Sequence, residues 1–249
     1  MSQLFRDTRR VVLSAGVALF CAAASAIPFH PAHYLPIAAS VVRVEADLLQ
    51  GKLSVGSGVT VAPAVIATSC HVVQDAVNIR VAGAGSTWAV DAERADVHHD
   101  VCYLRVPGWQ GKPVAMAPTS EPAIGSTVVA LGFTGGAAIM PRVGNVRALH
   151  EYEGGRVIES DAAFNSGSSG GGLFDEQGAL LGLLTFRLRN SETSYYTVPI
   201  EWVRDGMPRE EEWAGIAPLA DARPFWQGEA RELPEFMRAD AVQGTSKRE

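Results

Sequence analysis

Basic residues are scarce in this chain, and charged residues make up only 19% of it. Lysine and arginine together number 21 against 27 aspartates and glutamates, which gives a formal net charge of −6 at pH 7. No long basic run is present, and a surface that neutralises phosphate groups needs clustered lysine and arginine. We therefore expect no nucleic-acid partner and no electrostatic attraction to a membrane surface.

Long apolar runs are also missing, with one exception near the amino terminus. Residues 11–24 are mostly apolar, follow three arginines and end at Ala24-Ser25-Ala26, whose small side chains suit a signal peptidase. The run is shorter than the roughly 20 residues that span a bilayer, so we interpret residues 1–26 as a cleaved signal peptide. Arg9-Arg10 leaves both the general secretory and the twin-arginine route open. Export predicts a periplasmic or secreted protein without a membrane attachment after cleavage.

Cysteine is rare, with three residues in 249. Cys21 lies within the predicted signal, which leaves Cys70 and Cys102 in the mature chain. An even pair in an oxidising compartment favours a disulfide over two buried free thiols.

Amphipathic helical periodicity is hard to find, whereas short strands recur. Residues 41–48 alternate apolar and polar side chains, as a half-buried strand requires. Similar segments lie at 55–61, 65–68, 77–81, 88–92, 101–106, 127–133, 143–149, 157–161, 180–188 and 195–200. Many short strands without intervening helices predict an all-β fold with two six-stranded antiparallel barrels and a site in the cleft between them.

Glycine and proline between residues 107 and 122 indicate the connection between the barrels. We place the first barrel at about 38–112 and the second at about 119–205. Residues 206–249 form a carboxy-terminal extension, in which acidic residues and prolines alternate with scattered aromatic residues. The expected role of those aromatic residues is packing onto the barrels.

Three short blocks carry, in chain order, a histidine, an aspartate and a serine: residues 68–73, 99–104 and 167–173. Serine is a poor nucleophile without a neighbouring base, and the base needs a fixed tautomer. His71 and Asp100 can fill these two roles for Ser169. The glycines beside Ser169 leave backbone N–H groups free, so Gly167 and Ser169 are the predicted oxyanion hole.

Other interpretations of these blocks are weaker. The motif Gly-x-Ser-x-Gly also occurs in α/β-hydrolases, but there the histidine follows the serine, and here all six histidines precede it. Ser168 is an alternative nucleophile, although only Ser169 is followed directly by two glycines. His98 and His99 hint at a metal site, but neighbouring residues of a strand point to opposite faces. We therefore expect no metal and no cofactor.

The blocks and their flanks resemble trypsin-like (chymotrypsin-fold) serine proteases, and most closely the bacterial HtrA type. Residues 161–173 are similar to Asp-Ala-Ala-Ile-Asn-x-Gly-Asn-Ser-Gly-Gly-Pro-Leu, with serine at position 168 and glycine at 172 as departures. Residues 56–59 and 182–185 match as well. The resemblance covers about residues 38–205. It implies a serine endopeptidase that cleaves polypeptides through an acyl-enzyme, and the signal peptide predicts its export. Residues 206–249 are too few for the PDZ domain of the long HtrA proteins, so we expect a stand-alone protease domain.

The same resemblance gives a substrate pocket and one alternative function. It places Ala163 at the pocket floor, Phe164 beside it and Thr185 on a strand that pairs with substrate. No negative charge lies there, so we expect cleavage after small or medium apolar residues.

Cys70 and Cys102 each lie within two residues of a predicted triad member, so contact within the triad brings them within bonding reach. The alternative is a catalytically silent protease fold that binds a protein partner.

Overall fold

The computed structural model describes residues 31–49, 51–118, 122–189, 193–219 and 223–238. The predicted signal peptide, residues 1–26, lies outside the described residues. Among the described helices, none is long and apolar enough to cross a membrane.

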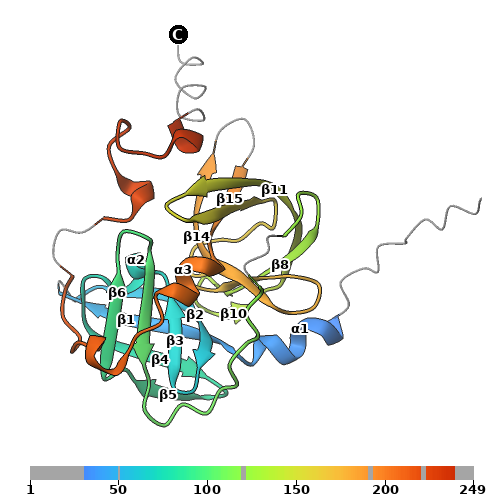
Figure 1. The fold of residues 1–249 in the computed structure, drawn as a ribbon. Helices are drawn as coiled ribbons and strands as arrows, with labels where there is room; N and C mark the ends of the chain where they lie inside the picture. Colours follow the sequence, from blue (N-terminus) through green and yellow to red (C-terminus); the bar gives the residue numbers. More distant parts are fainter. Residues whose placement is uncertain (1–30, 50, 119–121, 190–192, 220–222, 239–249) are drawn as a thin grey trace, which may run out of the picture.

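The first half of the chain folds into one curled antiparallel sheet (Figure 1). Its seven strands run in the order β5-β4-β1-β2-β3-β7-β6. Their bounds are β1 Val41–Leu48, β2 Leu53–Ala62, β3 Val65–Thr68, β4 Ala76–Gly83, β5 Ser86–Ala89, β6 Ala92–Asp96 and β7 Val101–Arg105. Helix α1 (Pro31–Ala38) precedes the sheet, and the short helix α2 (Cys70–Val73) follows β3.

The second half is a closed six-stranded barrel in the order β11-β12-β15-β14-β13-β8. Its strands are β8 Thr127–Leu131, β11 Arg142–Tyr152, β12 Gly155–Ser160, β13 Gly172–Phe174, β14 Leu180–Arg189 and β15 Thr193–Pro199. The small strands β9 (Phe133–Thr134) and β10 (Ala138–Ile139) pair beside it, and helix α3 (Ile200–Asp205) follows β15. The all-β prediction with two barrels is confirmed, except that the first sheet has seven strands and forms no closed ring.

Alternation along β1 shows how the sequence produces this sheet. Val42, Val44 and Ala46 are fully buried, while Arg43 and Glu45 on the other face pair with each other at the surface. Strand β1 pairs with β2 on one side and β4 on the other, so its buried face lies at the centre of the first core. Period-2 patterning therefore fixes which side of the sheet faces inward.

A large apolar cluster joins the two halves. Its buried members come from both sheets, from α3 and from the extension, and include Val41, Tyr103, Leu131, Tyr196, Trp202 and Phe225. Tyr103 of β7 is completely buried, and its hydroxyl donates to the carbonyl of Val203 in α3 at 2.6 Å. The halves are thus one packed unit with a shared interior.

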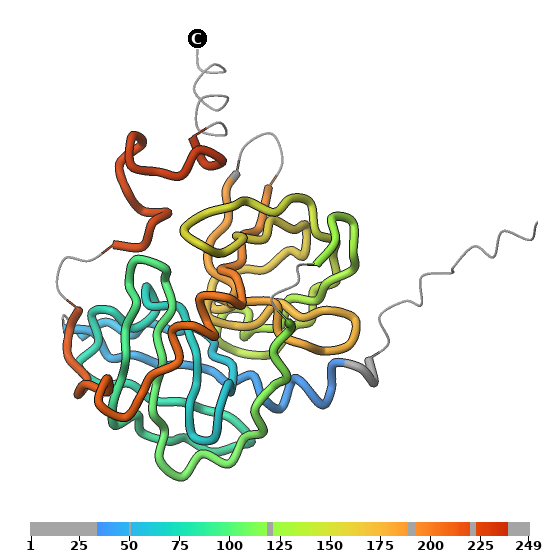
Figure 2. Tube along the Cα trace, viewed as in Figure 1, coloured from blue at the N-terminus to red at the C-terminus, as the bar shows by residue number. Residues whose placement is uncertain are grey.

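The carboxy-terminal extension packs on the first sheet and then returns to the junction of the halves (Figure 2). Ala214 pairs with Glu93 through two backbone hydrogen bonds, and the N–H of Leu219 donates to the carbonyl of Gln74 at 2.6 Å. Two short 3-10 helices, η1 (Glu210–Glu212) and η2 (Phe225–Gln227), lie along this path. The side chain of Phe225 is buried in the shared cluster, which agrees with the expected packing of these aromatic residues.

Candidate active site

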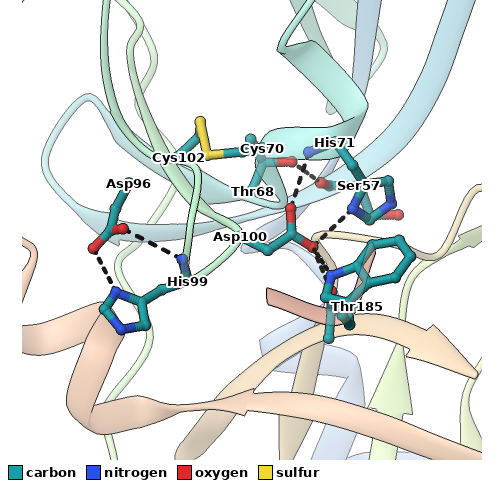
Figure 3. Close-up of a disulfide and its surroundings, with 10 residues drawn as sticks. Ser57, Thr68, Cys70, His71, Asp96, His99, Asp100, Cys102 and Thr185 are labelled. Atoms are coloured by element: carbon teal, nitrogen blue, oxygen red, sulfur yellow. Dashed lines mark hydrogen bonds and ion pairs between the residues drawn. A yellow bond between two sulfur atoms is a disulfide. The ribbon is translucent and has the colours of Figure 1, made fainter. Parts of the chain in front are cut away.

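His71 and Asp100 come from two neighbouring segments of the first sheet. His71 lies in α2, directly after β3, and Asp100 ends the turn of residues 97–100 between β6 and β7. Strands β3 and β7 are paired with Thr68 opposite Cys102, so the segments that follow one and precede the other lie side by side. A disulfide joins Cys70 to Cys102 with the Cα atoms 4.9 Å apart, as expected (Figure 3).

Asp100 holds His71 through two hydrogen bonds. The ring nitrogen Nδ1 of His71 lies 2.8 Å from Oδ2 of Asp100, and the backbone N–H of His71 donates to Oδ1 at 2.9 Å (Figure 3). Asp100 is fully buried and has a left-handed backbone with φ of +60°. An aspartate tolerates that region better than most residues, and the buried carboxylate fixes both the position and the tautomer of the ring.

Burial and the contact with Asp100 act in opposite directions on the pKa of His71. Burial of the ring disfavours the charged form, but the negative charge of Asp100 and its hydrogen bond outweigh burial. The pKa of His71 is therefore raised above its ordinary value of 6.5. Such a ring accepts a proton readily, as a general base must.

Two further donors serve the Asp100 carboxylate, and both contact Oδ2. One is the hydroxyl of Thr185 in β14, which sequence reasoning had placed in the substrate pocket. The other is the indole N–H of Trp226 in the extension, at 3.3 Å. The Trp226 ring meets the His71 ring edge-on at 5.3 Å and stacks on Phe186 at 5.2 Å. The extension therefore contributes a side chain to the site.

The Ser169 loop lies between β12 and β13 in the second half. Gly167 and Gly170 have φ values of +91° and +81°, a region that favours glycine. A Cβ atom on Gly170 would lie 2.2 Å from the carbonyl oxygen of Ser57, so a side chain does not fit there. The Ser169 hydroxyl donates to the carbonyl of Thr185 at 3.3 Å.

Ser57, from the block at residues 56–59, braces this loop from the first half. Its backbone N–H donates to the carbonyl of Ser169 at 2.8 Å, and its hydroxyl donates to the carbonyl of Gly167 at 2.7 Å. The same hydroxyl accepts the N–H of Phe133 at 2.8 Å. One small polar side chain therefore ties together the serine loop and the segment after β8.

Backbone geometry orients the two N–H groups predicted for the oxyanion hole. The carbonyl of Ser166 accepts the N–H of Gly135 at 2.8 Å, and the carbonyl of Ser168 accepts the N–H of Gly171 at 2.9 Å. In a trans peptide the next N–H points the opposite way, so the N–H groups of Gly167 and Ser169 face away from these partners. Within the described residues neither N–H donates to another group. Both are available to an anion.

The other two predicted pocket residues, Ala163 and Phe164, differ in burial. Ala163 is exposed, whereas Phe164 is buried in the core of the second barrel, with its ring 5.2 Å from that of Tyr195. Gly172, where the resembled motif has proline, lies in β13 with the Phe174 ring so close that a Cβ would lie 2.5 Å from it. That packing explains glycine at this position.

His98 and His99 do not lie on a strand. They belong to the turn of residues 97–100, so the expectation that they face opposite ways does not apply. Nε2 of each lies near the same carboxylate oxygen of Glu153, at 3.0 and 3.1 Å.

Known proteins are similar in sequence to the part of the chain that carries these residues. The family model for the trypsin-like peptidase domain matches residues 56–183. Among curated proteins, the chain is 29% identical over 170 residues to the anti-sigma-I factor RsgI9 of Acetivibrio thermocellus, covering 67% of this chain and 24% of that protein. It is 31% identical over 153 residues to the chloroplastic protease Do-like 1 of Arabidopsis thaliana, covering 55% of this chain and 35% of that one. The chain thus spans at most about a third of either relative.

Solved structures show the same fold. The Rv3671c protease of M. tuberculosis in its active form superposes with a TM-score of 0.65 at 22% identity, over 75% of this chain and 86% of that one. The serine endoprotease of Yersinia pestis gives a TM-score of 0.64 at 25% identity, over 77% and 66%. Because the family model covers more than half of the sequence, the chain belongs to the family of trypsin-like peptidase domains.

Proposed function

We propose that this protein is an exported serine endopeptidase that cleaves peptide bonds through His71, Asp100 and Ser169. The observation that carries the proposal is the buried Asp100 carboxylate on Nδ1 of His71. With that nitrogen occupied, Nε2 of the ring is the atom left to accept the Ser169 proton. Export to the periplasm or outside the cell rests on residues 1–26, and the disulfide suits an oxidising compartment.

The catalytic cycle begins when the Ser169 hydroxyl turns its hydrogen from the Thr185 carbonyl toward Nε2 of His71. The serine oxygen attacks the substrate carbonyl carbon while His71 takes the proton, and the N–H groups of Gly167 and Ser169 bind the resulting oxyanion. Protonated His71 then gives its proton to the leaving amine, which leaves an acyl group on Ser169. A water molecule, deprotonated by His71, hydrolyses that ester and restores the enzyme.

An extended polypeptide fits the edge of β14. On one edge of β14, strand β13 pairs only as far as Leu183. On the opposite edge, strand β15 pairs with β14 as far as Arg189. Beyond Thr185 the edge toward Ser169 has no strand partner among the described residues, and a substrate can add there as a strand. Because Ala163, the predicted pocket floor, is small, uncharged and exposed, we expect cleavage after small or medium apolar residues.

Trp226 gives the extension a role in this site. Its N–H shares the negative charge of Asp100 Oδ2 with His71 and Thr185, and its ring meets the His71 ring edge-on. Trp226 is therefore a positioning residue for the pair of Asp100 and His71.

Labelling with a fluorophosphonate probe tests the proposal. Folded wild-type protein is expected to react, and Ser169→Ala is expected to lose the label completely. Ser168→Ala is the matched control and is expected to keep the label, because the Ser168 side chain is buried and lies 3.5 Å from the Thr134 hydroxyl. Absence of labelling in folded wild-type protein contradicts the proposal. A peptide panel tests specificity, and a strong preference for arginine at the cleaved position contradicts the apolar assignment.

A second candidate is a catalytically silent module that binds a protein partner. The observation in its favour is the similarity to a protein named as an anti-sigma-I factor. This candidate predicts that wild-type protein binds a polypeptide without cleaving it and does not react with the fluorophosphonate.

A further inference from the structure

Two histidines of the first half and a glutamate of the second meet close to the candidate active site. Glu153 lies in the turn between β11 and β12, opposite the turn that carries His98 and His99. The Nε2 atoms of the two histidines lie 3.0 and 3.1 Å from the same oxygen, Oε2 of Glu153. All three atoms lie within 4.8 Å of one another. Nothing in the proposed peptidase mechanism uses this cluster.

We propose that His98, His99 and Glu153 bind a divalent transition-metal ion, with zinc the best fit, and that the ion joins the two halves of the protein one residue away from Asp100. Imidazole and carboxylate together suit zinc, which often takes three protein ligands and a water. Zinc bonds of about 2.0–2.1 Å in a tetrahedron place neighbouring ligand atoms about 3.3 Å apart. Both distances from Glu153 are already near that value.

Asp96 supplies the outer partner that a metal-binding histidine ordinarily has. Its Oδ2 lies 2.9 Å from Nδ1 of His99, and its Oδ1 accepts the backbone N–H of the same residue at 3.3 Å. With the ring proton held on Nδ1, the lone pair of Nε2 is free to bind a metal. Together Asp96 and Glu153 supply two negative charges, which a divalent ion neutralises when both imidazoles are neutral.

Packing holds the ligands in place while leaving the centre open. The ring of Trp202 lies 4.3 Å from that of His99, and its indole N–H donates to the carbonyl of Glu153 at 3.2 Å. The backbone N–H of Phe225 donates to the carbonyl of His98 at 2.9 Å. The side chains of His98 and Glu153 are 51% and 44% exposed, so an ion and a water ligand can enter from solvent.

The turn at Glu153 departs from ordinary hairpin chemistry. Tyr152 pairs with Gly155, which leaves Glu153 and Gly154 as a two-residue turn with φ values of +42° and +77°. Such turns favour Asn-Gly or Asp-Gly, and a left-handed glutamate is unfavourable. The glutamate side chain is longer than that of aspartate or asparagine. This length lets the Glu153 carboxylate cross the junction and contact both histidines of the first half.

Metal titration of the full chain tests the proposal. The protein carries Ser169→Ala to prevent self-cleavage, lacks an affinity tag and is treated with a chelator before ZnCl₂ is added in a calorimeter. We expect one zinc ion per chain and a higher unfolding temperature with zinc. Added Co²⁺ is expected to give visible absorption bands of a four- or five-coordinate site. His98→Gln and Glu153→Gln are expected to abolish both signals.

Two variants separate a metal site from a plain cluster of ion pairs. Asp96→Asn is expected to lower zinc affinity by about 10- to 100-fold through the His99 ring. The control His150→Gln removes a histidine outside the cluster, which lies 2.8 Å from Glu159 and stacks on Phe236, and is expected to leave zinc binding unchanged. Wild-type protein that neither binds zinc nor gains thermal stability overturns the proposal, whatever the variants do. Zinc binding that persists in Glu153→Gln, or that is lost in His150→Gln, also overturns it.

Discussion

Replacing Trp226 by phenylalanine removes one hydrogen bond from the Asp100 carboxylate while keeping an aromatic ring. A hydrogen bond to a charged group contributes about 1.5–3 kcal/mol. At 3.3 Å this bond is longer than the usual length of about 2.9–3.0 Å, so we take the lower limit of that range, about 1.5 kcal/mol. The free energy of unfolding of Trp226→Phe is expected to fall by that amount, and urea denaturation in the Ser169→Ala background measures it.

The pH profile separates positioning from simple packing. Without the indole N–H, more of the Asp100 charge acts on His71, so the pKa of His71 rises by up to about one unit, the equivalent of 1.36 kcal/mol. The acidic limb of kcat/KM on a peptide substrate then moves to higher pH. Phe225→Leu is the matched control, because Phe225 packs in the shared cluster without a bond to Asp100. An unchanged acidic limb in Trp226→Phe refutes the positioning role. A rise in kcat/KM of Trp226→Phe at high pH also refutes the positioning role, because the Trp226 side chain would then only obstruct substrate binding.

Three further predictions concern the pH limb, the disulfide and the oxyanion hole. Because the pKa of His71 is raised, and the protonated ring cannot accept a proton, wild-type kcat/KM is expected to fall as pH decreases through a midpoint above 6.5; a midpoint below that value contradicts the ion pair. Cys70 and Cys102 are 32 positions apart, so loss of the disulfide is expected to cost about 3–4 kcal/mol of unfolding free energy, measured by denaturation with and without reductant; a change below about 1 kcal/mol contradicts it. In Gly167→Ala the new Cβ would lie 2.5 Å from the Phe133 carbonyl oxygen and displace the predicted oxyanion donor, so kcat is expected to fall by about 100- to 1,000-fold. The control is Gly215→Ala, whose Cβ meets no atom within 4 Å and which is expected to keep full activity.

Features that depend on local pattern and chain order could be predicted from the sequence. Period-2 alternation identified the strands, because inward and outward residues differ sharply in a half-buried sheet. The contact of His71 with Asp100 was expected from the ordered histidine, aspartate and serine blocks, and that contact in turn placed Cys70 and Cys102 within reach of a disulfide. In the second barrel the pattern identified five of the six strands, because β13 has only three residues and shows no alternation. In the first sheet β5 was too short and exposed to be distinguished from β6, the next strand in sequence.

Contacts between distant segments could not be predicted in the same way. Trp226 lies 126 positions from Asp100 in a tail without periodicity, so no local rule connects them. The alternation rule failed at His98 and His99 because it assumes a strand, and a turn lets neighbouring side chains face the same group. Thr185 was found by motif alone; that its hydroxyl contacts Asp100 depends on how β14 crosses the junction of the halves.

The acyl-enzyme intermediate provides the most direct test of catalysis by Ser169. Wild-type protein is mixed rapidly with an activated ester of a short apolar peptide, quenched in acid and analysed by mass spectrometry. The account predicts a mass increase equal to one acyl group, located on Ser169 after digestion, and its absence in Ser169→Ala. An acyl group on another residue, or unmodified wild-type protein that nevertheless releases product, contradicts the account.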